Sequence, residues 1–353
     1  MASGGEIKKI LVRAPNWIGD AVMCTPALEC LKALYPSSGI TVLTKGRAVP
    51  VFENNPNAAA IIEYDHQGAH SGLGGKLKLR GELKGRGFDL AVLFQNAFDA
   101  AFISFISGIP ERAGYATDMR SGLLTKAIPV SAEIKKRHQV HYYINIVKAL
   151  GGSCASSIPK LYISKAEDDW ADGFIRKNGL EGSLMAGAAP GASYGPAKMW
   201  PSERFAEALA ELSASHRLVP LVFGGPEDSA TCREVARRMR GKYLDLSGRV
   251  TLRQFMALAS RMSVFITNDS GPMHISAALG VPTVAIFGST DPSLTGPLGA
   301  DVRIVSNNTP CSPCFARTCK FKHYDCLSIG SDVVVRAALD LLGAGSGSGK
   351  GVV

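Results

Sequence analysis

The sequence lacks any run of about 18 apolar residues, the length that a membrane-spanning helix needs. Its opening residues lack a basic start followed by an apolar segment, so we expect no secretory signal and a cytoplasmic protein. No helix-turn-helix, zinc-finger or RNP-type aromatic pattern accompanies the basic residues, which disfavours a nucleic-acid partner. What is present, 353 residues of which 46% are hydrophobic and 20% charged, suits a soluble chain of two domains.

The net charge of +9 is unevenly distributed along the chain. Residues 1–165 hold 20 Lys/Arg against 12 Asp/Glu, whereas the remainder holds 19 against 18. A basic first half indicates an anionic partner, such as a phosphorylated lipid or a membrane surface. A surface that is merely solubilising is the alternative, and composition does not separate the two.

Eight cysteines in a chain without an export signal are expected to be thiols rather than bridges. Four of them fall close together, with His323 among them, and their spacing is unlike that of a paired Cys-x-x-Cys ribbon. A structural metal, a disulfide and ordinary thiols all remain open for this group, and we predict no metal and no cofactor. The four are Cys311, Cys314, Cys319 and Cys326.

Apolar, β-branched runs alternate with longer helical stretches, and this series occurs twice. Continuous apolar runs predict strands covered on both faces, hence an α/β fold with parallel sheets. We expect two Rossmann-like domains, residues 6–165 and 180–342, facing a cleft, with a flexible tail at 343–353. A linker is predicted near 164–182, within which residues 168–177 could form a helix. Residues 66–75 are predicted to be a surface loop, and residues 18–35 one helix. The predicted strands are 9–12, 40–43, 60–62, 90–94, 184–187, 218–223, 263–266 and 283–287.

Asp20 follows the first predicted strand, at or near the start of the next helix. There it could cap the helix amides, or it could take a proton from an attacking hydroxyl. This junction lacks the Gly-x-Gly-x-x-Gly pattern of dinucleotide sites, so a nicotinamide cofactor is disfavoured.

Two junctions of the second half carry charged residues that suit a nucleotide. Lys198 lies in a loop of small residues just before a helix, where a compact positive charge and accessible amides suit a diphosphate. Glu227 follows the glycine pair that ends another strand. It could accept hydrogen bonds from ribose hydroxyls, or simply be an acid favoured in the first turn of a helix.

The segment from Thr267 to Ala278 predicts a helix start that faces an anion. Pro272 suits the first turn, Asp269 or Ser270 would cap it, and the remaining amides would point at a phosphate. His274 falls on the first turn, where it is either a ligand-binding or a structural histidine.

These junctions together resemble the heptosyltransferase family, glycosyltransferase family 9. Trp17-Ile18-Gly19-Asp20 followed by Cys24-Thr25-Pro26-Ala27-Leu28 resembles the family's opening motif. Lys198-Met199-Trp200-Pro201 is similar to its Lys-x-Trp-Pro motif, in the form found in enzymes of the heptosyltransferase II type. Asp269-Ser270-Gly271 with His274 resembles its Asp-[ST]-Gly-x-x-His pattern.

The resemblance implies a GT-B arrangement and an inverting, metal-independent transfer of heptose from ADP-heptose to the first heptose of the lipopolysaccharide inner core. Asp20 would be the general base, and Lys198 would neutralise the departing diphosphate. The enzyme would be a monomer that touches the inner membrane. Donor contacts would be Ser193, Lys198, Glu227, Asp269, Ser270, Gly271 and His274, and acceptor contacts would come from Arg47, Lys76, Lys78, Arg80, Arg120, Lys135, Lys136 or Arg137.

Three alternatives stay open at this stage. Another heptosyltransferase, or a different nucleotide-sugar donor on the same scaffold, is the nearest. A nucleotide- or anionic-lipid-binding protein without catalysis would use the same loops but would not need Asp20. A sugar epimerase would need an acid and a base on both faces of the sugar.

Overall fold

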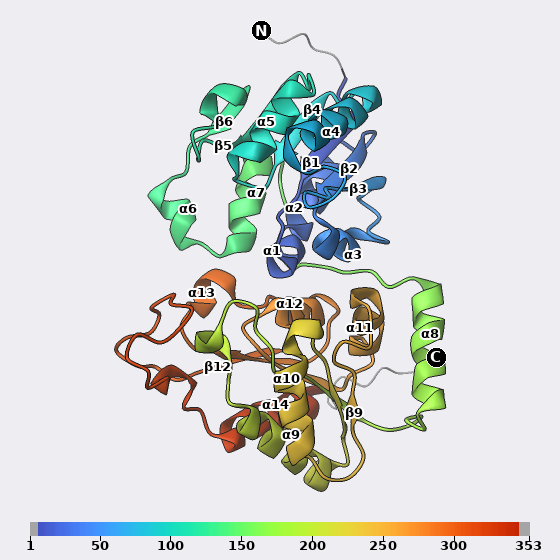
Figure 1. The fold of residues 1–353 in the computed structure, drawn as a ribbon, viewed down its shortest axis with the longest axis vertical. Coiled ribbons are helices and arrows are strands. Elements are labelled where there is room, and N and C mark those ends of the chain that lie inside the picture. The colour runs from blue at the N-terminus through green and yellow to red at the C-terminus, as the bar shows by residue number, and fades with distance from the viewer. Residues whose placement is uncertain (1–5, 346–353) are drawn as a thin grey trace. The chain divides into compact units, whose positions relative to one another are not determined.

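The structure is a computed structural model that describes residues 6–345. The chain divides into two compact units, Met1–Tyr162 and Ile163–Val353. We call them unit 1 and unit 2, and each is described by itself (Figure 1). Both are α/β units, as the sequence predicts.

Unit 1 contains a six-stranded sheet in the order β3-β2-β1-β4-β5-β6, with every neighbouring pair parallel. The central strands β1 and β4 are apolar and almost wholly buried, which is why continuous hydrophobic runs marked them in the sequence. The strands are β1 (Lys9–Arg13), β2 (Gly39–Thr44), β3 (Ala60–Glu63), β4 (Leu90–Leu93), β5 (Glu111–Tyr115) and β6 (Lys126–Ile128).

Helices connect the strands of unit 1 and bury its sheet. Leu79 and Leu83 of α4 pack into one core cluster with Leu11 and Leu93. On α7, Val140, Ile144 and Val147 are buried, with the spacing of one helix face. The helices are α1 (Ile18–Met23), α2 (Thr25–Leu34), η1 (Gly46–Ala48), α3 (Val49–Phe52), α4 (Gly72–Arg86), α5 (Phe98–Ile106), η2 (Ser121–Leu123), α6 (Ala132–Lys136) and α7 (Gln139–Ala149).

Unit 2 repeats this topology. Its parallel sheet has the order β12-β11-β10-β7-β8-β9, so the first strand of the unit again lies beside the fourth. The strands are β7 (Met185–Ala189), β8 (Val219–Val222), β9 (Leu244–Asp245), β10 (Val264–Asn268), β11 (Thr283–Phe287) and β12 (Val302–Ser306).

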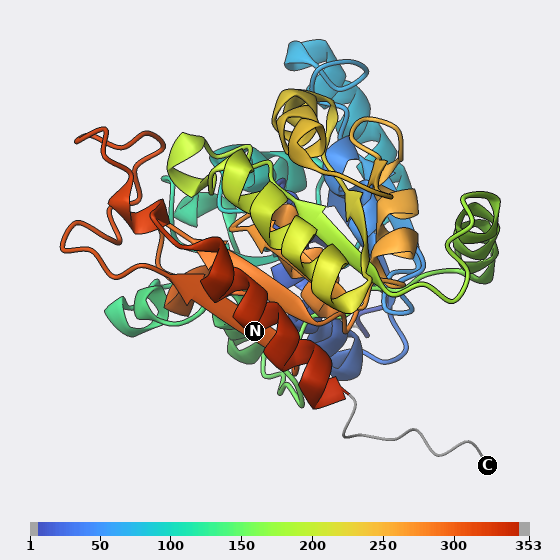
Figure 2. The same ribbon diagram turned by 90° about the horizontal axis from the view of Figure 1, so that it is seen from below.

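In unit 2, α9 packs against both α10 and α14, and Figure 2 shows α14 in red running beside the yellow-green α9. Trp200, Phe205 and Leu209 belong to the core cluster that these helices cover. The helices are α8 (Lys165–Lys177), η3 (Pro196–Lys198), α9 (Ser202–His216), η4 (Pro226–Asp228), α10 (Ser229–Arg238), α11 (Leu252–Ala259), α12 (Gly271–Ala278), α13 (Pro292–Thr295), η5 (Asp325–Leu327) and α14 (Ser331–Gly345).

All eight predicted strands are present, but the sequence analysis missed four others: the inner strand β5, which begins with the partly exposed Glu111 and Arg112, and the edge strands β6, β9 and β12. β6 and β9 have only three and two residues, and β12 is largely exposed. The helix predicted over residues 18–35 is two helices, broken at Cys24 because Pro26 lies at the start of α2. The loop predicted at 66–75 is too long, since α4 begins at Gly72.

The linker region contains a complete helix, α8, in agreement with the helical alternative for residues 168–177, and its Ser164 and Glu167 form a capping box. One further boundary prediction needs correction. The predicted flexible tail begins too early because α14 runs to Gly345. Residues 346–353 lie outside the described residues.

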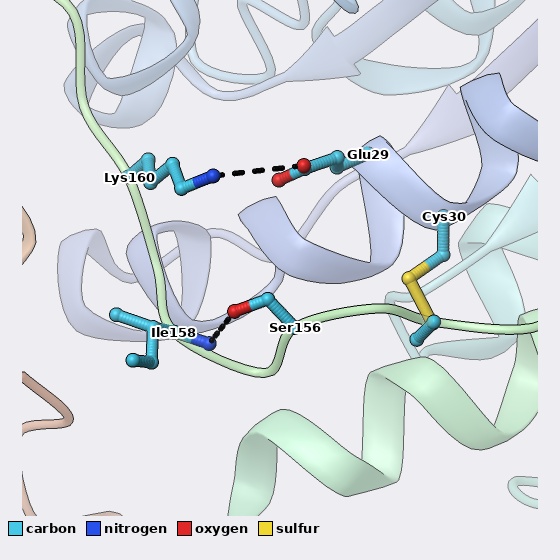
Figure 3. The surroundings of a disulfide bond; sticks show 6 residues. Glu29, Cys30, Ser156, Ile158 and Lys160 are labelled. Carbon is cyan, nitrogen blue, oxygen red and sulfur yellow. Dashed lines mark hydrogen bonds and ion pairs between the residues drawn. A yellow bond between two sulfur atoms is a disulfide. The ribbon is translucent and has the colours of Figure 1, made fainter.

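The expectation that all cysteines are thiols is wrong for one pair. Cys30 of α2 and Cys154, five residues beyond the end of α7, form a disulfide with Cα atoms 5.1 Å apart. Figure 3 shows the segment from Ser156 to Lys160 passing beside the helix that carries Cys30, and Lys160 Nζ lies 3.6 Å from Glu29 Oε1. The two cysteines are 124 residues apart in sequence, so only the fold brings them together.

Strand order marks one position in each unit as the place for a ligand. In open parallel sheets, ligands bind beyond the carboxyl ends of the strands, where the chain reverses its direction of winding. That point lies between β1 and β4 in unit 1 and between β7 and β10 in unit 2. Asp20 follows β1, Lys198 follows β7, and Asp269 follows β10 directly.

Candidate active site

Asp20 lies in the first turn of α1, and the N-cap of that helix is Trp17. The Tyr143 hydroxyl of α7 donates to Asp20 Oδ1 at 3.0 Å. Burial raises the pKa of Tyr143 well above its ordinary value, and the neighbouring Asp20 carboxylate adds to this. The phenol therefore stays protonated and remains a hydrogen-bond donor to Asp20.

Arg13, at the end of β1, holds the loop that leads to α1, and the sequence analysis missed it. Its guanidinium donates to Leu43 O at 3.2 Å and to Asn16 Oδ1 at 3.1 Å. Burial lowers the pKa of Arg13 to about 10, yet the group remains charged at neutral pH. An arginine directly after the apolar run Ile10-Leu11-Val12 is the sequence signal that could have identified it.

The basic residues predicted to meet an acceptor fall into different environments. Arg47 is exposed and lies over the Trp17 ring, with its Cζ 5.2 Å from the ring centroid. Lys136 is exposed at the end of α6. Lys76 is ion-paired with Asp99 at 2.5 Å.

The prediction that Arg120 contacts an acceptor requires a correction. Its side chain is 0% exposed, and its guanidinium donates to Tyr115 O at 2.9 Å and to Asn96 Oδ1 at 3.2 Å. Burial lowers the pKa of Arg120 to about 10. Because these bonds hold the guanidinium inside unit 1, Arg120 fixes the loop after β5 and does not present its charge to a ligand.

Lys198 and Asp269 form the central ion pair of unit 2, with Lys198 Nζ 2.6 Å from Asp269 Oδ2. The side chains are 13% and 4% exposed. The Thr290 hydroxyl also donates to Asp269 Oδ2. Thus the loops after β7, β10 and β11 converge on one carboxylate.

The loop that carries Lys198, residues 190–201, is held by β10. The Asn268 side chain accepts from Trp200 N at 3.0 Å and donates to Pro190 O at 2.7 Å, so it ties both ends of this loop. Trp200 itself is buried, and its indole donates to Ile329 O at 3.0 Å. These bonds fix the position of the Lys198 backbone.

The start of α12 lies shortly after Asp269, at the carboxyl end of β10. Ser270 is the N-cap, but its side chain makes no capping hydrogen bond and donates instead to Asn268 O at 3.3 Å. First-turn amides of α12 therefore lack a side-chain cap. His274 is buried on this helix, whereas Ser193 is exposed in the loop after β7 and Glu227 is exposed in η4.

The cysteine-rich segment, residues 311–326, lies against the Lys198 loop. Its four cysteines are free thiols that line one cavity together with His323 and Ala197. Burial raises the pKa of Cys326, while backbone N–H donors, Tyr324 N first among them, lower the pKa of Cys319. Across residues 6–345, no three or more His, Cys, Asp or Glu side chains are grouped so as to hold a metal ion.

Comparison with known proteins identifies the class of enzyme. The profile of glycosyltransferase family 9 (heptosyltransferase) matches residues 76–325. Lipooligosaccharide heptosyltransferase 2 of Campylobacter jejuni serotype O:6 is 31% identical over 325 residues, which cover 90% of this chain and 94% of that protein. Lipopolysaccharide heptosyltransferase 2 of Escherichia coli is 29% identical over 84% of this chain and 87% of its own.

Solved structures agree with this result. A family 9 glycosyltransferase of Veillonella parvula superposes with a TM-score of 0.88 at 27% identity, covering 98% of this chain and 100% of its own. Heptosyltransferase II of Escherichia coli gives a TM-score of 0.81 at 27% identity, covering 96% and 99%. The likenesses extend over nearly the whole chain and define a glycosyltransferase built on two Rossmann-like units.

The chain belongs to glycosyltransferase family 9, the heptosyltransferases. None of its helices within residues 6–345 combines the length and apolar character needed to cross a bilayer.

Proposed function

We propose that the chain transfers heptose from ADP-heptose to the first heptose of the lipopolysaccharide inner core, with inversion at the anomeric carbon. The observation that carries this proposal is the Lys198–Asp269 pair at the switch point of unit 2, in a chain 31% identical to a lipooligosaccharide heptosyltransferase 2. Unit 2 would bind the donor, and unit 1 the acceptor.

Donor binding would use the loops that meet at Asp269. Lys198 and the first-turn amides of α12, near Ser270 and Gly271, suit a diphosphate because they offer positive charge and N–H donors. Asp269 and the exposed Glu227 offer carboxylate oxygens to sugar or ribose hydroxyls. Ser193 and His274 would complete the donor contacts.

Acceptor binding would use the basic surface of unit 1. Arg47 and Lys136 are exposed, which suits contact with acceptor phosphates, whereas the buried Arg120 is withdrawn from this role. The excess of 20 Lys/Arg over 12 Asp/Glu in residues 1–165 favours an anionic acceptor and a peripheral contact with an anionic membrane surface. We propose a cytoplasmic monomer, without a nucleic-acid partner.

In the reaction, Asp20 would take the proton of an acceptor hydroxyl as its oxygen attacks the anomeric carbon of the donor. The bond from that carbon to the ADP oxygen breaks on the opposite face, so one displacement inverts the configuration. Lys198 and the α12 amides would receive the charge that develops on ADP. Each such group is worth about 2–4 kcal/mol of transition-state stabilisation. This mechanism needs no divalent metal and no cofactor.

The proposal is tested by incubating the purified protein and a chelator with ADP-heptose and acceptors that bear zero or one heptose, then weighing the products. Growth of the one-heptose acceptor by one heptose unit supports the proposal. Growth of the zero-heptose acceptor alone would instead assign the first heptose transfer. ADP-heptose binding without any product would identify a binding protein, and a need for added metal would overturn the metal-independent mechanism.

Asp20→Asn supplies the test of the base. We expect turnover to fall by a factor of about 10³ while ADP affinity is retained, because the amide cannot accept the proton. Glu133→Gln, an equal change of charge at an exposed site of α6, is the matched control. Near-normal turnover of Asp20→Asn would refute the assignment.

A further inference from the structure

Arg317 belongs to the cysteine-rich segment, and that segment is bound to the Lys198 loop through its backbone. Ala197 N donates to Arg317 O at 3.0 Å, and the Tyr194 hydroxyl donates to Phe315 O at 2.6 Å. Phe315 N in turn donates to Ser289 O at 2.7 Å, in the loop after β11. Residues 315–317 are therefore held against two of the loops that converge on Asp269.

The cysteine-rich segment and the Lys198 loop pack closely against each other at Gly195. This residue has a φ of 143°, and a Cβ built there would lie 2.6 Å from Arg317 O. A side chain at this position would push the two segments apart. The absence of one lets the Arg317 backbone approach the Lys198 loop.

Two cations lie against one aromatic ring as a result. Lys198 Nζ is 4.7 Å from the Tyr194 ring centroid, and Arg317 Cζ is 5.3 Å from it. The face of an aromatic ring attracts cations, so Tyr194 favours this placement of both groups.

The two cations differ in their partners. The charge of Lys198 is matched by Asp269, which is almost fully buried. Arg317 is exposed, and no carboxylate of residues 6–345 forms an ion pair with it. A donor diphosphate carries more than one negative charge, and the neutral Lys198–Asp269 pair does not balance it.

We propose that Arg317 binds the diphosphate of the nucleotide-sugar donor together with Lys198, and that the cysteine-rich segment serves to deliver this guanidinium to the donor site. This inference rests on the proposed function. A guanidinium presents parallel N–H donors that match two phosphate oxygens, which an ammonium cannot do. Arg317 would thus supply the net positive charge and the two-point contact, and Lys198 the ammonium that Asp269 holds in place.

The test compares the binding of ADP and of adenosine, by titration calorimetry, to the wild type and to Arg317→Met. Methionine keeps an unbranched apolar stem against Tyr194 but removes the charge. Arg303→Met is the matched control, because Arg303 is also exposed in unit 2 and its guanidinium bonds only to the neighbouring Val302 O among the contacts described. Arg317→Lys separates charge from two-point contact.

We expect Arg317→Met to weaken ADP binding about tenfold, the size of a lost charge-assisted hydrogen bond, and to leave adenosine binding unchanged. Its ADP affinity should also depend less steeply on salt than that of the wild type, and Arg317→Lys should fall between the two. If Arg317→Met binds ADP as tightly as the wild type, or loses the same affinity for ADP and for adenosine, the proposed role of Arg317 is overturned. The proposed function of the chain is not affected by either result. Failure of the folded wild type to bind ADP at all would overturn the proposed function and this inference with it.

Discussion

The Tyr143 hydroxyl donates to Asp20 Oδ1 across 3.0 Å, from a residue 123 positions later in the chain. Tyr143 is buried and packs against Phe94, with ring centroids 5.8 Å apart. The Tyr143 phenol therefore orients one oxygen of the Asp20 carboxylate.

Tyr143→Phe removes this donor and keeps the ring in place. Because the hydrogen bond orients the proposed base, we expect kcat to fall about tenfold with the KM for both substrates unchanged. Steady-state kinetics measure kcat and KM, and a thermal unfolding scan measures the stability of the variant. A raised KM at constant kcat, or a loss of activity that merely tracks a loss of folded protein, would show that Tyr143 does not position the base.

Asp269→Asn leaves Lys198 without its carboxylate partner in a site where only 13% of the lysine side chain is exposed. Removing one partner of a buried pair costs about 3 kcal/mol, since the remaining charge is not compensated. Urea denaturation should show this loss. The double variant Lys198→Met, Asp269→Asn should be more stable than Asp269→Asn. If the losses of unfolding free energy in the two single variants simply add up in the double variant, the two residues do not stabilise each other as a pair.

Gly195→Ala places a methyl group against Arg317 O in a backbone conformation that side chains rarely adopt. We expect a loss of about 1–3 kcal/mol of unfolding free energy and weaker ADP binding, because the Lys198 loop must move. Gly173→Ala, within α8, is the control: nothing lies within 4 Å of its added methyl group, and alanine favours a helix. Equal stability of the two variants would refute the close fit.

Glu167→Gln tests how stability depends on pH. The Arg253 guanidinium, 2.6 Å away, lowers the pKa of Glu167 to about 2. A carboxyl group whose pKa is depressed by folding stabilises the protein above its unfolded pKa, and this contribution is lost as the pH falls toward the folded pKa. The variant should therefore be less stable by about 1–2 kcal/mol at pH 7, after allowance for solvent screening, and should match the wild type near pH 2.

The control is Glu181→Gln, which breaks an exposed ion pair with Arg176 and should change stability little at any pH. Denaturant titrations at several pH values measure the unfolding free energy of both variants and of the wild type. A destabilisation of Glu167→Gln that does not shrink in acid would contradict the electrostatic origin.

The Cys30–Cys154 disulfide closes a loop of over a hundred residues, so its loss should lower the unfolding free energy by about 2–5 kcal/mol. Thiol titration of the denatured, unreduced protein should count six thiols. Reductant should destabilise the wild type and leave Cys30→Ser, Cys154→Ser unchanged. Eight titratable thiols before reduction would show that the bridge does not form.

Local sequence determined the central strands and the junctions that follow them. A buried strand such as β4 must be apolar along its whole length, so it is visible in a short window of residues. Asp20, Lys198 and Asp269 could be singled out because each follows such a strand at a junction of small or polar residues. The short edge strand β9 carries no comparable signal, since it has only two residues and both are partly exposed.

The tertiary structure alone decided which residues far apart in the chain contact one another. Nothing near Asp20 in the sequence points to Tyr143, and nothing near Lys198 points to Arg317. Likewise, Arg120 resembles any surface arginine in sequence and is buried only because the strands around it close over the guanidinium. The physical reason is the same in each case: strand order and helix packing set which loops meet, and those contacts depend on the whole sheet rather than on any one segment.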